Sequence, residues 1–362
     1  MESKTPPLLP GQRLRARGAA VNPTGRFEAA RREGFADEWD IPEDDRLVRT
    51  ETSLERPRSA ITYNRSPDVP FDRSINPYRG CEHGCIYCFA RPSHAYLNLS
   101  PGLDFETRLI ARPGIAGVLA GELAKPSYKV APIAIGTNTD PYQPIDAQHG
   151  LMRQILAVLG DFNHPVWITT RGTLIERDID LIAAMATRGL ASVSISLTTL
   201  DASLARKMEP RAPAPARRLA TIRALAAAGI PVRVQVSPLI PALTDHALEA
   251  ILEAAAKAGA THATSIPLRL PREVADLFRN WIETTFPDSA ERVMGRVREL
   301  HGGRDYDPDF GTRMTGQGIW ADLIKRRLEV ARRRLGLTRG LPALRTDLFR
   351  VPPKAGDQLS LF

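Results

Sequence analysis

Three cysteines stand within eight consecutive residues, as Cys81, Cys85 and Cys88, and the sequence contains no others. Three thiols cannot all pair with one another as disulfides, so this spacing favours a metal or redox role. Thiolates in a C-x3-C-x2-C loop can hold three irons of a [4Fe–4S] cluster. The fourth iron then has no protein ligand, and the loop is predicted to carry a cluster with one open coordination position.

Zinc is the alternative metal for this loop. A structural zinc site has four ligands, and His83 or His94 could complete a Cys3His set. The three-then-two spacing, placed at the end of the first of six predicted strands, favours the cluster instead. We therefore interpret His83 and His94 as supporting or core histidines.

Short β-prone segments alternate with helical patterns from about residue 74 onward. Such alternation is typical of parallel βαβ units, and six units predict an α/β fold, a partial (β/α)6 TIM barrel with its chemistry at the C-terminal ends of the strands. The expected strands are 74–78, 130–136, 165–170, 191–197, 231–237 and 261–267. The expected helices are 145–159, 176–188, 216–228, 244–258 and 271–284.

The remaining segments are expected to extend this core, which we place at residues 61–290. Residues 1–60 are rich in proline, arginine and acidic residues and are predicted to form an N-terminal extension that wraps the core or is partly irregular. Residues 291–350 form a basic helical extension, with one apolar face along 320–335. Residues 351–362 form a flexible tail. No run is apolar enough for a targeting signal or a membrane span, so a cytoplasmic protein is expected.

Positive charge is concentrated towards the end of the chain. The formal net charge is +8, and residues 320–350 contain nine Lys or Arg against three Asp or Glu. Clustered positive charge attracts polyanions. We expect contact with nucleic acid, most plausibly DNA.

Residues 76–91, Asn-Pro-Tyr-Arg-Gly-Cys-Glu-His-Gly-Cys-Ile-Tyr-Cys-Phe-Ala-Arg, resemble the cluster loop of radical S-adenosylmethionine (radical SAM) enzymes. The branch related to spore photoproduct lyase, also called DNA-repair-photolyase-like, is the most similar, and the resemblance covers about residues 60–290. It implies a partial TIM barrel in which S-adenosylmethionine binds the open iron. One electron from the reduced cluster would cleave it and release a 5′-deoxyadenosyl radical. A flavodoxin or ferredoxin is implied as electron donor.

The resemblance also implies contacts to the cofactor. Tyr87, just before the last cysteine, would pack on the adenine. The end of the second strand would meet the methionine ammonium through Gly136, Thr139 and Asp140, although threonine and aspartate in such a turn also commonly cap helices.

The third and fourth strands complete the implied cofactor site. Arg171 stands where relatives usually have a lysine that approaches the cofactor's carboxylate. Ser194 and Ser196 alternate with apolar residues on the fourth strand. Of the two, Ser196 is the predicted contact to the ribose or the carboxylate, with a purely structural serine as the alternative. Ala242 replaces a usual glycine in the loop after the fifth strand.

One departure concerns the substrate. Spore photoproduct lyase carries a cysteine hydrogen donor just before the acidic residue of its second strand, whereas this chain has Thr137 and Asn138 there. We therefore expect a lyase-like or other radical reaction in DNA repair or modification that differs from reversal of spore photoproduct. The alternatives are an RNA-modifying enzyme and a non-catalytic iron–sulfur adaptor.

The last five residues resemble the pentapeptide by which bacterial repair proteins bind the β sliding clamp of DNA polymerase III. An amide and apolar anchors on a polar linker suit a docking peptide. The alternative is an apolar end that folds back on its own domain. The predicted clamp-binding residues are Gln358, Leu359, Leu361 and Phe362.

Overall fold

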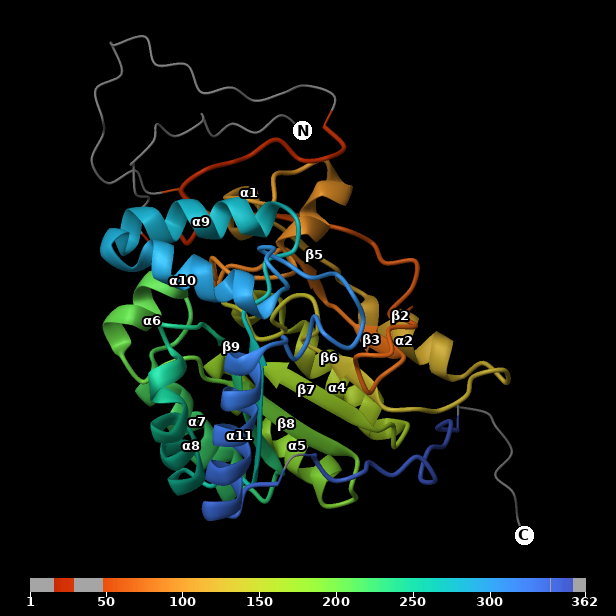
Figure 1. The fold of residues 1–362 in the computed structure, drawn as a ribbon. Helices are drawn as coiled ribbons and strands as arrows, with labels where there is room; N and C mark the ends of the chain where they lie inside the picture. The colour runs from red at the N-terminus through yellow and green to blue at the C-terminus, as the bar shows by residue number, and fades with distance from the viewer. Residues whose placement is uncertain (1–15, 29–47, 339, 354–362) are drawn as a thin grey trace.

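The computed structural model describes residues 16–28, 48–338 and 340–353, whose arrangement Figure 1 shows. The main sheet has the strand order β10-β9-β8-β7-β6-β3-β2. Its strands from β3 to β10 are parallel neighbours in chain order, and β2 pairs antiparallel with β3. The predicted partial (β/α)6 barrel is therefore confirmed. The strands span Ile61–Tyr63 (β2), Arg73–Ile75 (β3), Ile133–Ile135 (β6), Val166–Thr170 (β7), Ala191–Ser196 (β8), Val232–Leu239 (β9) and His262–Pro267 (β10).

Side chains alternate between the two faces of this sheet. On β8, Val193 and Ile195 are buried in the main apolar core with residues of the surrounding helices. Ser194 and Ser196 therefore face the barrel interior, where Nε of Arg233 from β9 donates to Oγ of Ser194 at 3.0 Å. At β8 the barrel interior is therefore polar and the outer face of the sheet is apolar.

Helices follow most of these strands. They are Ile115–Leu123 (α2), Asp146–His149 (α3), Leu151–Asp161 (α4), Ile179–Ala186 (α5), Ala202–Met208 (α6), Pro215–Ala227 (α7), Leu248–Lys257 (α8), Glu273–Thr285 (α9), Pro287–Leu300 (α10) and Ile319–Arg334 (α11). Several pack against the sheet, whereas the buried apolar residues of α6, α9 and α10 form a second cluster with Cys85, Ile86 and Tyr87. In Figure 1, α9 and α10 lie together on the side towards which the arrowhead of β7 points. They border the C-terminal ends of the strands.

The helices and strands differ from the sequence-based expectation in three ways. The helix expected over 145–159 is divided into α3 and α4 at Gly150, whose φ of +59° is left-handed and ends the first segment. Helices α2, α6 and α10 were not predicted. The strand expected over 74–78 is shorter, because Asn76 and Pro77 separate β3 from β4 (Tyr78–Arg79).

A second, small sheet supports the cysteine loop. It has the order β1-β5-β4, with β1 at Glu51–Leu54 and β5 at Arg108–Ala111. Tyr78 of β4 pairs with Ala111 of β5, so the residues just before the cysteines are held by strand pairing. The sequence analysis did not predict this sheet, whose strands have at most four residues.

Residues 302–318 contain no helix or strand and link the two edges of the main sheet. Just before this segment, the His301 ring lies 2.9 Å from the carbonyl oxygen of Leu268, next to β10. Within it, the Gly311 N–H donates to Asp68 in the β2–β3 loop at 2.8 Å, and Arg313 forms an ion pair with Asp68 at 2.5 Å. We call residues 302–318 the strap. It spans the open side of the partial barrel.

Two expectations lie wholly or partly outside the described residues. Most of the predicted N-terminal extension is not described, although residues 16–28 pack near the cysteine loop. Of the predicted tail, only residues 351–353 are described. None of the helices in the described ranges is long and apolar enough to cross a membrane.

Candidate active site

The cysteine loop follows β4, at the C-terminal edge of the barrel's first strand. Cys81 and Cys85 are buried, Cys88 is half-buried, and all three thiols are free. The loop folds back on itself, since the N–H of Cys88 donates to the carbonyl of Cys85 at 3.2 Å. Gly80 and Gly84 have left-handed φ values of +75° and +66°, and an added Cβ at Gly84 would lie 2.6 Å from Glu106 Oε2. Glycine is therefore required where the loop turns.

A buried ion pair anchors this loop from beneath. Nη2 of Arg91 lies 2.5 Å from Oε1 of Glu106, and both side chains are fully buried. Nε of Arg91 donates to the Cys85 carbonyl at 2.9 Å. The N–H groups of Gly18 and Ala19 also donate to Glu106, at 2.9 and 2.8 Å, so the described part of the N-terminal segment packs against the loop.

The thiols fit a cluster that supplies positive charge. Burial raises the pKa of Cys81 well above its ordinary value, and the nearby Asp140, Cys85 and Cys88 raise it further. Burial also raises the pKa of Cys85 to about 12, although Arg171 opposes this effect. Close, desolvated thiols of this kind ionise when they bind metal. In the described parts of the chain, no three His, Cys, Asp or Glu side chains are grouped for a single metal ion. A cubane cluster instead binds each thiolate on a different iron.

Arg171, at the end of β7, reaches into the cysteine loop. Its Nη1 lies 2.9 Å from Sγ of Cys85, 2.8 Å from the hydroxyl of Tyr87 and 2.8 Å from Oε1 of Glu209. Its guanidinium also lies over the Tyr87 ring, 5.8 Å from the centroid. Three of the predicted site residues, Cys85, Tyr87 and Arg171, are thus in direct contact.

Glu209, just after α6, organises this contact and was not predicted. Its carboxylate accepts hydrogen bonds from Tyr87, from Thr198 at 3.1 Å, and from Arg218, whose Nη2 forms a buried ion pair with it. Burial disfavours the charged form, but Arg218 and Arg171 overcome this effect and lower the pKa of Glu209 to about 2. The sequence signal was its position after the fourth strand, where barrel chemistry gathers.

Asp140 and Thr139 connect the second strand end to its neighbours. The carboxylate of Asp140 accepts from Thr170 at 2.6 Å, from the Arg171 N–H at 2.8 Å and from the Tyr142 N–H at 2.9 Å. Its Oδ2 also lies 3.4 Å from Nδ1 of His83. Burial raises its pKa, but His83 and these hydrogen bonds overcome that effect and lower the pKa to about 2.

Gly136 and Ser196 lie on adjoining parts of the same strand edge. At Gly136, with φ +88°, an added Cβ would lie 1.9 Å from the Thr169 carbonyl, so only glycine allows this close approach of β6 and β7. The Ser196 carbonyl accepts from Nη1 of Arg218 at 3.2 Å. Thr139 donates to the Tyr78 carbonyl at 3.0 Å. The barrel therefore gathers all the predicted cofactor-contact residues along one edge.

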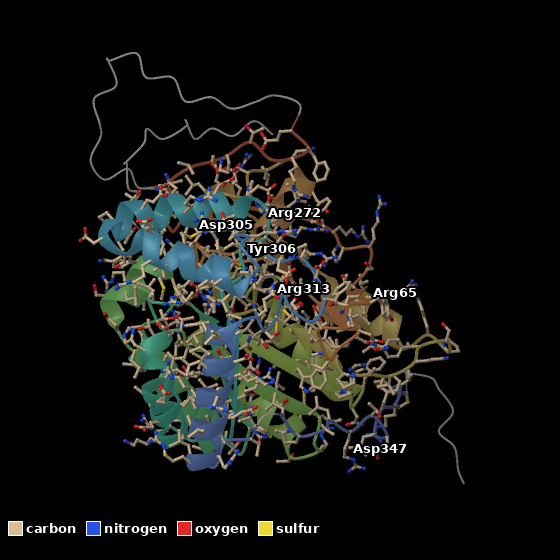
Figure 2. The ribbon with its side chains drawn as sticks, in the orientation of Figure 1. Arg65, Arg272, Asp305, Tyr306, Arg313 and Asp347 are labelled. Carbon is tan, nitrogen blue, oxygen red and sulfur yellow. The ribbon has the colours of Figure 1, made fainter. Side chains whose placement is uncertain are left out.

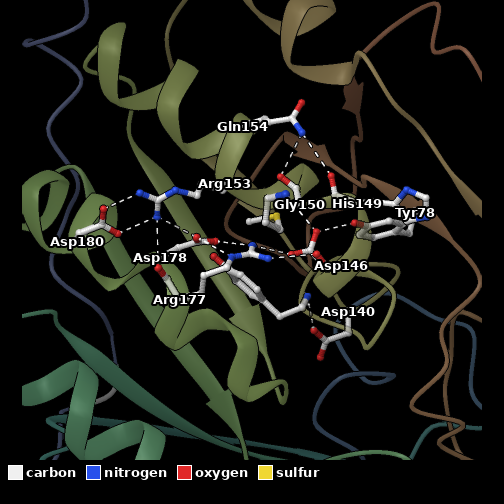
Figure 3. A network of polar contacts seen from close by, with 12 residues as sticks. Tyr78, Asp140, Asp146, His149, Gly150, Arg153, Gln154, Arg177, Asp178 and Asp180 are labelled. Carbon is white, nitrogen blue, oxygen red and sulfur yellow. Dashed lines mark hydrogen bonds and ion pairs between the residues drawn. The ribbon is translucent and has the colours of Figure 1, made fainter.

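A second polar network holds the base of the loop, as Figure 3 shows. The Tyr78 hydroxyl donates to Asp146 at 2.5 Å, and Arg177 bridges Asp146 and Asp178 with two 2.8 Å ion pairs. Arg153 extends the network from Asp178, at 3.2 Å. These buried carboxylates fix β4 to α3 and α5, and with them the start of the cysteine loop.

Two other proteins are similar to this chain in sequence. The chain is 39% identical over 262 residues to an uncharacterized protein of Mycobacterium tuberculosis, which covers 72% of this chain and 76% of that protein. It is 25% identical over 224 residues to an uncharacterized protein of Methanocaldococcus jannaschii, covering 62% and 80%.

A solved structure of spore photoproduct lyase with dinucleoside spore photoproduct has the same fold. It superposes with a TM-score of 0.58 at 15% sequence identity, over 79% of this chain and 81% of that one. The family model described as "Radical SAM superfamily" matches residues 75–255, which include the cysteine loop and the strand ends that surround it. This protein therefore belongs to the radical SAM superfamily.

Proposed function

We propose that this chain is an enzyme that holds a [4Fe–4S] cluster on Cys81, Cys85 and Cys88, reductively cleaves S-adenosylmethionine, and acts on DNA in repair or modification. The observation that carries this proposal is the contact of Arg171 with both Cys85 and Tyr87, at the C-terminal edge of a six-unit parallel barrel. A cation and an aromatic ring therefore lie beside Cys85, one of the three thiols.

The bound cluster and cofactor would supply a 5′-deoxyadenosyl radical, and the chain's own residues would position them. The thiolates of the loop would hold three irons. Arg171 would neutralise negative charge near Cys85 and present a donor to the cofactor's carboxylate. Tyr87, held by Arg171 and Glu209, would offer its ring to the adenine.

Residues at the end of the second strand would bind the cofactor's ammonium group. Asp140 stays ionised at neutral pH, because its pKa is lowered to about 2. Its hydrogen bonds to Thr170 and to the Arg171 backbone also link the ammonium side of the site to the carboxylate side. Gly136, Thr139 and Ser196 would complete the rim.

Two observations support a nucleic-acid substrate. The chain carries a net charge of +8, which attracts polyanions. The spore photoproduct lyase structure with the same fold contains a dinucleoside. All three cysteines of this chain lie in the loop, so the reaction we propose uses no cysteine outside the cluster as hydrogen donor.

Two partners complete the proposal. A small electron-transfer protein such as flavodoxin or ferredoxin would reduce the cluster. The β sliding clamp of DNA polymerase III would bind Gln358, Leu359, Leu361 and Phe362 and bring the enzyme to newly replicated DNA.

The test is anaerobic reconstitution with iron and sulfide. About four irons per chain and formation of 5′-deoxyadenosine from the cofactor with reductant are expected. Cys85→Ala should abolish both, whereas Cys85 variants of a zinc protein would change zinc content alone. Protein that takes up only zinc and shows no iron–sulfur absorption would contradict the proposal. Mass spectrometry of nucleosides from a deletion strain, with and without DNA damage, then tests the DNA substrate.

A further inference from the structure

Two exposed phenylalanines, one of them next to the cysteine loop, each lie beneath an arginine. Phe89 directly follows Cys88 and is 47% exposed, and the guanidinium of Arg269 lies 4.9 Å from its ring centroid. Phe310 in the strap is 61% exposed, and the guanidinium of Arg313 lies 4.4 Å from its centroid. Single exposed aromatic rings are ordinary on protein surfaces, so we infer binding from the presence of two ring–arginine pairs together with an unbalanced charge.

The two pairs belong to one surface. Arg269 follows β10 by two residues, and it is close enough to Arg313 of the strap and to Asp68, the partner of Arg313, for their charges to act on it. Figure 2 shows Tyr306 and Arg313 between the α9–α10 end of the molecule and the β2–β3 edge. We call Phe89, Arg269, Tyr306, Phe310 and Arg313 the mouth patch. It lies at the end of the barrel that holds the cysteine loop.

The two arginines of the mouth patch differ in whether a carboxylate pairs with them. Arg313 is paired with Asp68 at 2.5 Å. Arg269 forms no ion pair with any carboxylate in the described residues, and burial lowers its pKa. The charge of Asp68 acts on Arg269, but that carboxylate already pairs with Arg313. A partly desolvated cation without a counter-charge of its own is costly, and an anionic ligand would relieve this cost.

We propose that the mouth patch binds unstacked nucleotides of a DNA strand, with bases stacked on Phe89 and Phe310 and a phosphate at Arg269. This inference rests on the proposed function and names the form in which DNA would meet the site. Arginine and aromatic side chains side by side are the combination that binds single strands, because stacking needs an exposed base face and the phosphate needs a cation.

The same chemistry disfavours an intact duplex as the ligand. In a duplex the base faces are covered by their neighbours, so a phenylalanine ring can stack only on a base that has left the helix. Phe89 is one residue from Cys88, so a base stacked on it would lie beside the cluster loop. The patch would therefore select a nucleotide in the position where the proposed chemistry takes place.

The test measures binding of the reconstituted holoprotein to a short single strand that contains 2-aminopurine, whose fluorescence falls on stacking. Phe89→Ala and Phe310→Ala should each weaken binding about tenfold and reduce the quenching, with little change in salt dependence. Phe89→Trp should restore both. Arg269→Gln should lower the slope of log affinity against log salt by about 0.7. An equimolar blunt duplex should bind without quenching.

Tyr63→Ala is the matched control. Tyr63 is 60% exposed and lies under Arg73 at 5.4 Å, and it pairs with the first residue of β3 and is not part of the mouth patch. Phe89 adjoins Cys88, so the iron content of Phe89→Ala is measured to show that the cysteine loop still holds its cluster. Phe310→Ala changes a residue far from the cysteines in sequence, so it tests the mouth patch without altering that loop. If the wild type binds the strand and all mouth-patch variants behave like Tyr63→Ala, the proposed role of the mouth patch is wrong and the proposed function stands. If the wild type binds no DNA, both are wrong.

Discussion

Nη1 of Arg171 lies 2.9 Å from Sγ of Cys85, at the centre of the candidate site. The same nitrogen lies 2.8 Å from Glu209, which also holds Arg218. One buried carboxylate thus compensates two buried cations, and this balance places Arg171 beside the cysteine.

Replacing Glu209 with glutamine should destabilise the protein strongly. Loss of the charge leaves the buried Arg171 and Arg218 without a counter-charge, an effect of about 3 to 5 kcal/mol in the free energy of unfolding. Urea denaturation of the apoprotein measures it. Glu249→Gln, which breaks a partly exposed ion pair with Arg327, is the matched control and should cost at most about 1 kcal/mol. Equal effects of the two variants would show that Glu209 does not organise the site.

Asp140→Asn should weaken cofactor binding while the iron content is retained. The change removes a charged partner for the ammonium group, a loss of about 1.5 to 3 kcal/mol. Calorimetry of S-adenosylmethionine with reconstituted protein measures it. Asp178→Asn, another buried and ion-paired aspartate, controls for general destabilisation. Unchanged affinity in Asp140→Asn would leave Asp140 with only its structural role between β6 and β7.

Stability should fall with acid because His164 is buried in its neutral form. Burial lowers its pKa to about 4, and its ring lies 2.7 Å from the Tyr128 hydroxyl and 3.0 Å from the Pro165 carbonyl. The unfolded state binds the proton first, near pH 6.5, so this contribution is complete above pH 6.5 and is lost as the pH falls towards 4.

The loss amounts to about 3 kcal/mol across that interval. It is measured as the difference in unfolding free energy between wild type and His164→Gln, determined by urea titration at several pH values. The variant should show a smaller slope between pH 6.5 and 4. Parallel curves for the two proteins would contradict this assignment.

The arginines of α11 should contribute to DNA binding through phosphate contacts. Replacing Arg332, Arg333 and Arg334 with glutamine should weaken binding to all sequences and reduce its salt dependence. Arg334 already pairs with Glu253 of α8, so we expect a smaller effect than three free cations would give. Filter binding at several salt concentrations measures it. An unaltered slope would assign these residues to a solvated face.

The last residues should bind the sliding clamp independently of catalysis. Leu361 and Phe362 are expected to be the anchors, with micromolar affinity for an isolated peptide of residues 354–362. Fluorescence polarisation of this peptide against purified clamp tests the interaction, with the double variant Leu361→Ala, Phe362→Ala as control. Truncation after Asp357 should abolish clamp binding and retain cofactor cleavage. Equal binding of the two peptides, or unfolding on truncation, would exclude this role.

The sequence by itself determined the cysteine loop and the order of the barrel strands. Cysteine spacing is local, and period-two alternation such as Val193, Ser194, Ile195 and Ser196 already separates the faces of a strand. The strand ends named for cofactor contact were implied by the family resemblance, and they meet at one edge because the C-terminal ends of parallel strands do.

Only the tertiary structure decided which side chains meet at that edge. Glu209 is 38 residues from Arg171 and more than 120 from Tyr87, and no local pattern joins them. Phe89 likewise lies under Arg269, which stands 180 residues later in the chain, and Arg313 of the strap pairs with Asp68. Such contacts arise when closure of the barrel and the crossing of the strap bring distant segments together, and their partners are selected by burial and charge balance, not by neighbouring residues in the chain.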